Sequence, residues 1–182
     1  MAPRHLIQIL CLVAAAWCSG ARSAPPAPEY QVKAAYLFNF VQFVEWPEAA
    51  YESPTAPFVI GVVGEDPFGN ILDQVTAGES LGQHPLVVRR FASARDISDC
   101  NILFIGPGEA PRLGDTLKAV RGRSVLTVTD IPGAEKKGAI IALVNDRNRI
   151  RMRINVAAAK TNGLVISSKL LRPAEVVGKE GS

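Results

Sequence analysis

The sequence has only three cysteines and two histidines among its 182 residues. Cys11 and Cys18 lie in an N-terminal segment with the pattern of a secretory leader, so Cys100 alone is expected in the mature chain. One thiol cannot form an intramolecular disulfide, and we expect none. Cys100 opens an apolar run typical of a strand, which favours a buried and inert thiol. An intermolecular disulfide is the alternative.

Groups that commonly perform catalysis or bind metals are scarce as well. His84 is the only histidine outside the leader, and it precedes Pro85 in an expected turn, where we interpret it as solvated. The sequence has no Gly-x-Ser-x-Gly motif and no His, Cys and carboxylate set at metal-ligand spacing. Ser167-Ser168-Lys169 lacks Ser-x-x-Lys spacing, and helix capping suits these serines better. We therefore expect no catalytic residue, metal or cofactor, and predict that the protein is not an enzyme.

No apolar run reaches the roughly 20 residues that a membrane-spanning helix needs. The run Leu6–Trp17 follows the basic Arg4 and precedes the small residues 19–21. This is the order of a signal peptide over residues 1–23, with cleavage after Ala21 or Ser23. An uncleaved anchor is the alternative. The sequence thus predicts an exported protein.

Charge of one sign does not dominate the chain. The formal net charge is +3, and it falls to +1 without residues 1–23, because Arg4 and Arg22 leave and no acid does. So small an excess says little about partners. The expected export and the lack of aromatic residues interleaved with basic ones argue against binding to nucleic acid.

The rest of the sequence predicts one α/β domain over residues 30–178, after a Pro/Ala-rich linker at 24–29. A helix is expected from Tyr30 to Trp46, where Pro47 ends it. The continuous apolar run Phe58–Val63 suits a strand buried on both faces. The alternation of short apolar runs and helical segments predicts a mixed, mostly parallel sheet with flanking helices. Further strands are expected at Leu86–Phe91, Asn101–Ile105 and Val125–Val128, and further helices at Phe68–Ala77 and Ala110–Val120.

The C-terminal part changes character. Gly138–Val144 and Arg149–Ile154 flank the polar turn 145–148, which predicts a C-terminal antiparallel hairpin. Asn155 can then cap a short helix that Gly163 ends. Because a proline disrupts helical hydrogen bonding, Pro173 predicts a loop through residue 172 and a short helical turn after it.

Three arginines share one face of the second hairpin strand. Arg149, Arg151 and Arg153 alternate with apolar residues, so their side chains are expected roughly 6–7 Å apart. Arginine binds carboxylates and phosphates, which makes this face a candidate site for an anion or for an acidic partner. A solvated strand face is the alternative. The turn Gly106–Gly108 is a second candidate for an anion, against an ordinary strand-to-helix turn.

Two aromatic residues of the first helix lie where a polar face is expected. At about 100° per residue, Phe38 and Trp46 project into a stripe formed by Gln31, Asn39, Gln42 and Glu45. Aromatic side chains dominate many protein interfaces, so both are candidate contacts with a partner. Packing in the core is the alternative for each.

Two segments of the chain resemble the YfiR family of periplasmic proteins. Val32–Pro47 (VKAAYLFNFVQFVEWP) is similar to the start of the family's domain. Arg149–Asn155 (RIRMRIN), followed by Gly163–Leu171 (GLVISSKLL), is similar to its closing motif. Phe58–Val63 lies between them in the expected place. The resemblance covers essentially the whole mature chain and implies a periplasmic α/β domain that is not an enzyme.

The resemblance also implies partners. The best-known member of the family represses an inner-membrane diguanylate cyclase by binding its periplasmic portion, and an outer-membrane lipoprotein can sequester that member. Relatives accompany membrane sensor kinases. We therefore expect a regulator of cyclic-di-GMP signalling that binds such a membrane protein and can also form a homodimer. The alternative is a small-ligand-binding sensor accessory to a sensor kinase.

The closing motif adds residues to the candidate contact and also departs from the family pattern. Leu170, Leu171 and Glu175 join the two helix aromatics as a mostly apolar candidate surface. Pro173 and Glu175 stand where the family's tail continues as Leu-Ala. Cys100 alone cannot supply the redox-responsive cysteine pairs of the best-known member.

Overall fold

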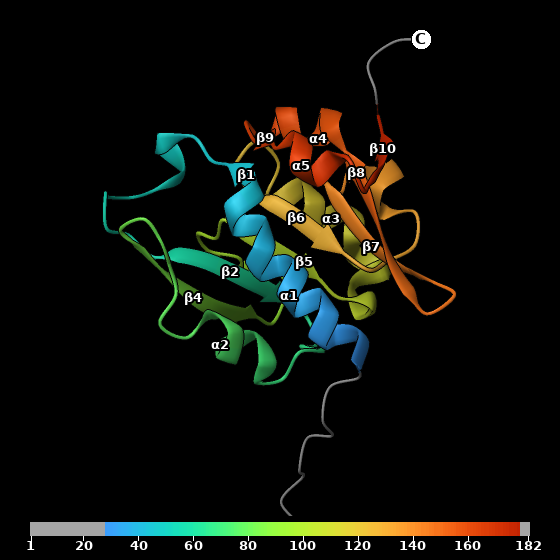
Figure 1. Ribbon diagram of the computed structural model, residues 1–182, viewed down its shortest axis with the longest axis horizontal. Coiled ribbons are helices and arrows are strands. Elements are labelled where there is room, and N and C mark those ends of the chain that lie inside the picture. The colour runs from blue at the N-terminus through green and yellow to red at the C-terminus, as the bar shows by residue number, and fades with distance from the viewer. Residues whose placement is uncertain (1–27, 179–182) are drawn as a thin grey trace, which may run out of the picture.

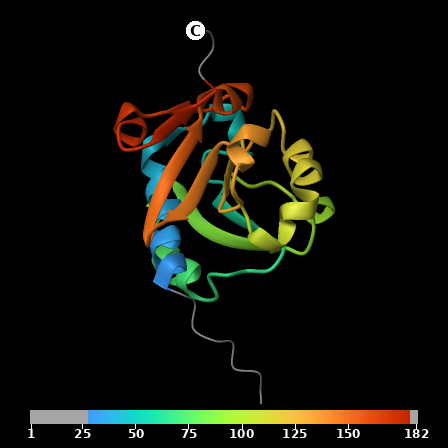
Figure 2. The same cartoon turned by 90° about the vertical axis from the view of Figure 1, so that its right-hand side faces the viewer.

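The computed structural model describes residues 28–178, which form an α/β domain of three layers. The expected signal peptide 1–23 and the first part of the linker lie outside the described residues. Helices α1 (Pro28–Phe43) and α2 (Ile71–Thr76) cover one face of the main sheet, and α3 (Leu113–Ala119) covers the other (Figures 1 and 2).

The main sheet has the strand order β10-β8-β7-β6-β5-β2-β4-β3. Neighbouring strands run parallel except in the pairs β7–β8 and β3–β4. The predicted mixed, mostly parallel sheet is therefore confirmed. Its strands are β2 (Phe58–Val63), β3 (Ser80–Leu81), β4 (His84–Phe91), β5 (Ile102–Ile105), β6 (Leu126–Thr129), β7 (Ile141–Asp146), β8 (Arg149–Asn155) and β10 (Glu175–Val177).

The first helix is shorter than predicted at its end and longer at its start. Pro28 and Glu29, which the sequence placed in the linker, form its first turn, where a proline loses no hydrogen bond. The prediction of helix up to Trp46 is wrong, because α1 ends at Phe43. The next two residues form β1 (Val44–Glu45), which pairs antiparallel with β9 (Val165–Ile166), so a strand partner far along the chain ends the helix before Pro47 does.

The predicted hairpin is present as β7 and β8. Its two turn residues, Arg147 and Asn148, have φ angles of +52° and +62°. Positive φ at both central positions is the mark of a type I′ turn, whose twist matches that of the flanking strands. Asn155 then caps α4 (Val156–Thr161) as predicted, since its Oδ1 accepts a hydrogen bond of 2.9 Å from the Ala158 amide.

The prediction for the tail, a loop through residue 172 followed by a helical turn, is wrong. A short helix, α5 (Ser168–Leu171), comes first, and its cap is Ser167, which accepts a hydrogen bond from the Lys169 amide. Pro173 follows this helix instead of interrupting it. The tail then forms β10, parallel to residues 153–155 of β8, because the outer edge of that strand offers free backbone partners.

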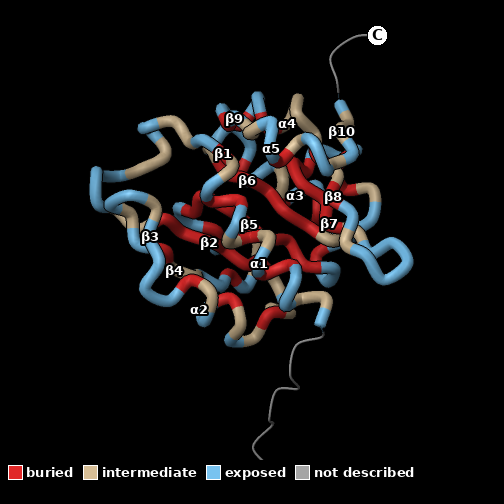
Figure 3. Tube along the Cα trace, in the orientation of Figure 1, coloured by how far each residue is buried: buried red, intermediate tan, exposed pale blue. Residues whose placement is uncertain are grey.

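Four short 3₁₀ segments connect these elements within residues 28–178. They are η1 (Glu48–Ala50), η2 (Ala94–Asp96), η3 (Pro107–Arg112) and η4 (Ala134–Lys137). Strands β2, β5 and β6 are buried on both faces, as the apolar run of β2 predicts, and Figure 3 shows burial concentrated in these central strands.

One apolar core lies on each side of the sheet. The first packs beneath α1 and α2 and includes Phe40, Phe58 and Phe104. The second lies beneath α3 and includes Leu113 and Cys100. Burial raises the pKa of the Cys100 thiol to about 12, and the side chain is only 7% exposed. The predicted burial of Cys100 is confirmed.

Candidate functional site

A groove follows α1 on the side of the β7–β8 hairpin and α5. It comprises two adjoining cavities of about 360 and 650 Å³, which share Tyr36 and Ile150. We call this surface the α1 groove. Its walls come from α1, from residues 145–152 of the hairpin and from residues 169–173 of the tail. The start of the domain and its closing motif, more than 100 positions apart, thus meet in one place.

The α1 groove combines an apolar floor with a basic rim. Val32, Tyr36, Ile150 and Leu170 contribute apolar surface. Val32 is 47% exposed, which is unusual for a large aliphatic side chain in this domain. The rim carries three cations, which are Arg149, Arg151 and Lys169. A surface of this kind suits an apolar segment that also carries carboxylates.

Three of the residues predicted from sequence lie in the α1 groove, namely Leu170, Arg149 and Arg151. Leu170 is 7% exposed, so it forms part of the wall more than a projecting contact. The Arg151 Nε lies 3.6 Å from Oδ2 of Asp146, and both side chains are well exposed. Such an exposed pair contributes little to stability, so Arg151 can exchange its partner at small cost.

Phe38 and Trp46 lie outside the α1 groove. Both are half-buried and pack against the first core. The Trp46 indole donates a hydrogen bond of 3.2 Å to the Asn101 carbonyl, and its ring meets the Phe58 ring edge-on at 4.8 Å. A tryptophan with its N–H satisfied and its ring packed in this way primarily stabilises the fold.

Leu171, Glu175 and Arg153 have partners inside the domain. Leu171 is half-buried against the first core. The Arg153 Nε donates to the Glu175 carboxylate at 2.9 Å, and its Nη1 lies 3.6 Å from the fully buried Glu135 carboxylate. Arg153 therefore ties β10 to β8 and η4. The three predicted arginines therefore differ in role. Arg149 and Arg151 lie beside the α1 groove, whereas Arg153 forms ion pairs within the fold.

A buried charged cluster at the start of α1 was not predicted. The Lys33 side chain is 1% exposed, and its Nζ lies 2.6 Å from Oδ2 of Asp130. Lys33 also pairs with Glu29, one helical turn earlier. The Tyr30 hydroxyl donates to the same Asp130 oxygen at 2.9 Å. The available signal was the i, i+4 pair of Glu29 and Lys33 within an otherwise apolar helix.

These contacts shift the acidity of two members of the cluster. Hydrogen bonds from Lys33 and Asn145 lower the pKa of Glu29. Burial, together with the adjacent negative charge of Asp130, raises the pKa of Tyr30 far above its ordinary value. The contacts of Tyr30 and Lys33 with Asp130 fix the start of α1 to the end of β6.

The carboxyl ends of parallel strands are the usual ligand site of open α/β sheets. Here that edge is filled by side chains of the domain. Asp130 follows β6 and is bound by Lys33. Glu109 follows the turn Gly106–Gly108, is 2% exposed, and pairs with Arg112 at 2.7 Å. A buried carboxylate beside this turn disfavours an anion there, which weakens the turn as a candidate site.

Residues 28–178 contain no group of three His, Cys, Asp or Glu side chains that could hold a metal ion. His84 is not the solvated turn residue that the sequence suggested. Its Nδ1 lies 2.7 Å from the Ala56 carbonyl oxygen, and its ring stacks on that of Tyr51 at 4.0 Å. It begins β4 and packs the adjoining loop, which explains its position without a catalytic role.

Comparison with known proteins supplies the family. A protein-family model described as YfiR/HmsC-like matches residues 30–175. A search of curated proteins gives no match. Within the described part of the chain, none of the helices has both the length and the apolar character needed to cross a membrane. The match spans nearly all of the domain, and we conclude that the chain belongs to the YfiR/HmsC-like family, whose members are periplasmic regulators of cyclic-di-GMP signalling and not enzymes.

Proposed function

We propose that this protein binds the periplasmic portion of an inner-membrane diguanylate cyclase through the α1 groove and thereby represses the cyclase. The observation that carries the proposal is the exposed Val32 beside Tyr36 and Ile150, under a rim formed by Arg149, Arg151 and Lys169. An apolar floor offers affinity, and a basic rim, in which Arg149 and Lys169 form no ion pair within the described residues, selects an acidic partner segment.

Repression follows from differential affinity. A regulator shifts its partner toward the inactive arrangement only by binding that arrangement more tightly than the active one. An extended groove formed by a helix, a hairpin and a tail suits this task, because it contacts the partner along its length. An outer-membrane lipoprotein that occupied the same groove would compete with the cyclase and release it.

The test uses the two exposed valines of the described domain as a matched pair. Val32 lies in the α1 groove, and Val165 on β9 is 59% exposed away from it. Both positions tolerate a charged side chain without burying it, so Val32→Glu and Val165→Glu are expected to fold alike. Deleting the gene should raise cellular cyclic-di-GMP. Wild type and Val165→Glu should restore the low level, whereas Val32→Glu should not.

Two results would contradict the proposal at different points. Unchanged cyclic-di-GMP after deletion would exclude a repressed cyclase and favour a sensor-kinase partner. Full complementation by Val32→Glu would retain the function and reject the α1 groove as the contact. Circular dichroism of both variants provides the control for folding.

A further inference from the structure

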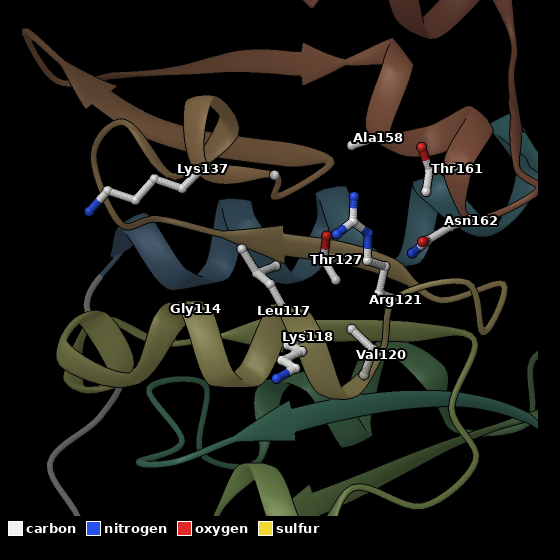
Figure 4. Close-up of a pocket in the computed structure, with 11 residues that line it drawn as sticks. Gly114, Leu117, Lys118, Val120, Arg121, Thr127, Lys137, Ala158, Thr161 and Asn162 are labelled. Atoms are coloured by element: carbon white, nitrogen blue, oxygen red, sulfur yellow. The ribbon is translucent and has the colours of Figure 1, made fainter.

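A separate cavity lies on the face of the sheet opposite α1, between α3 and α4. Its volume is about 320 Å³, and the turn that leads into β7 closes one side (Figure 4). No residue of the α1 groove lines it. We call it the α3–α4 pocket. A volume near the lower end of the range for ligand sites suits a small metabolite.

The floor and walls of the α3–α4 pocket are apolar or internally satisfied. Leu117, Val120 and Ala158 contribute carbon surface. The Thr127 hydroxyl accepts a hydrogen bond from the Ile140 amide at 2.9 Å. The Asn162 amide group donates to the Val125 carbonyl at 2.8 Å and accepts from the Gly122 amide at 2.9 Å. These polar groups are already hydrogen-bonded to the backbone and fix the shape of the cavity. Recognition of a ligand therefore depends on other side chains.

Three cations line the α3–α4 pocket, and no Asp or Glu does. Lys118, Arg121 and Lys137 have neither an ion pair nor a hydrogen bond from their side chains within residues 28–178. By contrast Arg123, two positions after Arg121, lies 3.3 Å from the Asp99 carboxylate and also donates to backbone carbonyls. The positive charge around the pocket is therefore uncompensated.

The orientation of the three cations singles out one of them. Figure 4 shows the Arg121 guanidinium extending across the pocket toward α4, whereas the amines of Lys118 and Lys137 point away from it. A guanidinium with no partner presents a planar fork of donors that matches a carboxylate or a phosphate. The two lysines add attraction at the rim.

We propose that the α3–α4 pocket binds a small organic anion. Arg121 holds the anionic group, and the apolar body of the ligand lies on Leu117, Val120 and Ala158. The carbon surface of the floor favours a carboxylate with a hydrocarbon part over free inorganic phosphate, which would leave that surface unused. The proposal is independent of the α1 groove and of the partner assigned to it.

Isothermal titration of the purified protein tests this site with three probes, which are benzoate, the neutral isostere benzamide and inorganic phosphate. Benzoate should bind more tightly than either of the others. Arg121→Gln should weaken benzoate binding about tenfold or more, which corresponds to losing a charged hydrogen-bonded pair. Arg95→Gln on η2 removes an equal charge outside the pocket and is the matched control.

Several results would overturn the proposal. Equal binding of benzamide would show that the anion is not recognised, and tighter binding of phosphate alone would exclude a carboxylate with an apolar body. If Arg121→Gln and Arg95→Gln weaken benzoate binding equally, the loss of affinity comes from the change in net charge and not from a contact in the pocket. Absence of benzoate binding at millimolar concentration would reject the site. Amide chemical-shift changes should centre on Leu117 and Ala158, and changes centred on the α1 groove instead would also refute it.

Discussion

Replacing Lys33 by methionine should destabilise the domain strongly, although the substitution preserves most of the side-chain volume. The Lys33 ammonium is buried and lies 2.6 Å from Asp130. Removing it leaves the Asp130 charge buried, with only the Tyr30 hydroxyl as a donor. The second Asp130 oxygen already has no hydrogen-bond partner among the described residues. An uncompensated buried charge is the costliest outcome of breaking an ion pair.

The magnitude can be bounded. Removing one partner of a buried ion pair costs about 3–5 kcal/mol, against a total stability of about 5–15 kcal/mol for a domain. With a urea m-value of about 2 kcal/mol/M, the denaturation midpoint should fall by about 1.5–2.5 M. Urea unfolding at neutral pH, followed by Trp46 fluorescence, measures this shift.

A second substitution separates charge from packing. Asp130→Asn in the Lys33→Met background removes the buried negative charge that has lost its cation. The double variant should therefore unfold at a higher urea concentration than Lys33→Met alone. If the double variant is no more stable than the single one, the loss comes from packing and the electrostatic reasoning fails. A midpoint for Lys33→Met within about 0.5 M of wild type would refute it as well.

Two further predictions concern the ends of the domain. The pKa of Glu29 is lower in the folded than in the unfolded protein, so its contribution to stability is present above about pH 4.5 and is lost as the pH falls through the folded value. Glu29→Gln should therefore destabilise by less than about 1 kcal/mol at pH 7, and a difference that persists undiminished at pH 3 would contradict this. Arg153→Gln should accelerate amide exchange in β10 by releasing Glu175, whereas Arg149→Gln, which breaks no ion pair within the described residues, should leave it unchanged.

Much of the fold followed from local patterns. Continuous apolar runs identified the central strands, since a strand buried on both faces has no polar alternation. The hairpin and the Asn155 cap followed from turn and capping chemistry, which acts within a few residues. The errors arose where a distant segment decided the local structure. Val44–Glu45 became a strand because Val165–Ile166 pairs with it, and the tail became a strand because β8 had a free edge.

The candidate site was also predicted only in part, because local patterns show which way a side chain faces but not which distant residues it meets. Alternation correctly placed Ile150, Met152 and Ile154 toward the core, and the arginines between them on the other face. It could not show that Arg153 meets Glu135 and Glu175, since neither acid is near it in sequence. The helical projection that singled out Trp46 assumed a helix at that position. The structure ends the helix three residues earlier and directs the indole to Asn101.

The two candidate sites can be tested separately, because they lie on opposite faces of the sheet and share no residue. A defect in repression by Val32→Glu with normal benzoate binding would place partner recognition in the α1 groove alone. Loss of benzoate binding in Arg121→Gln with normal repression would leave a ligand site that does not control the partner. If Arg121→Gln also altered repression, coupling would have to pass through the sheet. The segment between η4 and β7 would then be the connection to examine, since Lys137 and Gly138 line the α3–α4 pocket while β7 and β8 form a wall of the α1 groove.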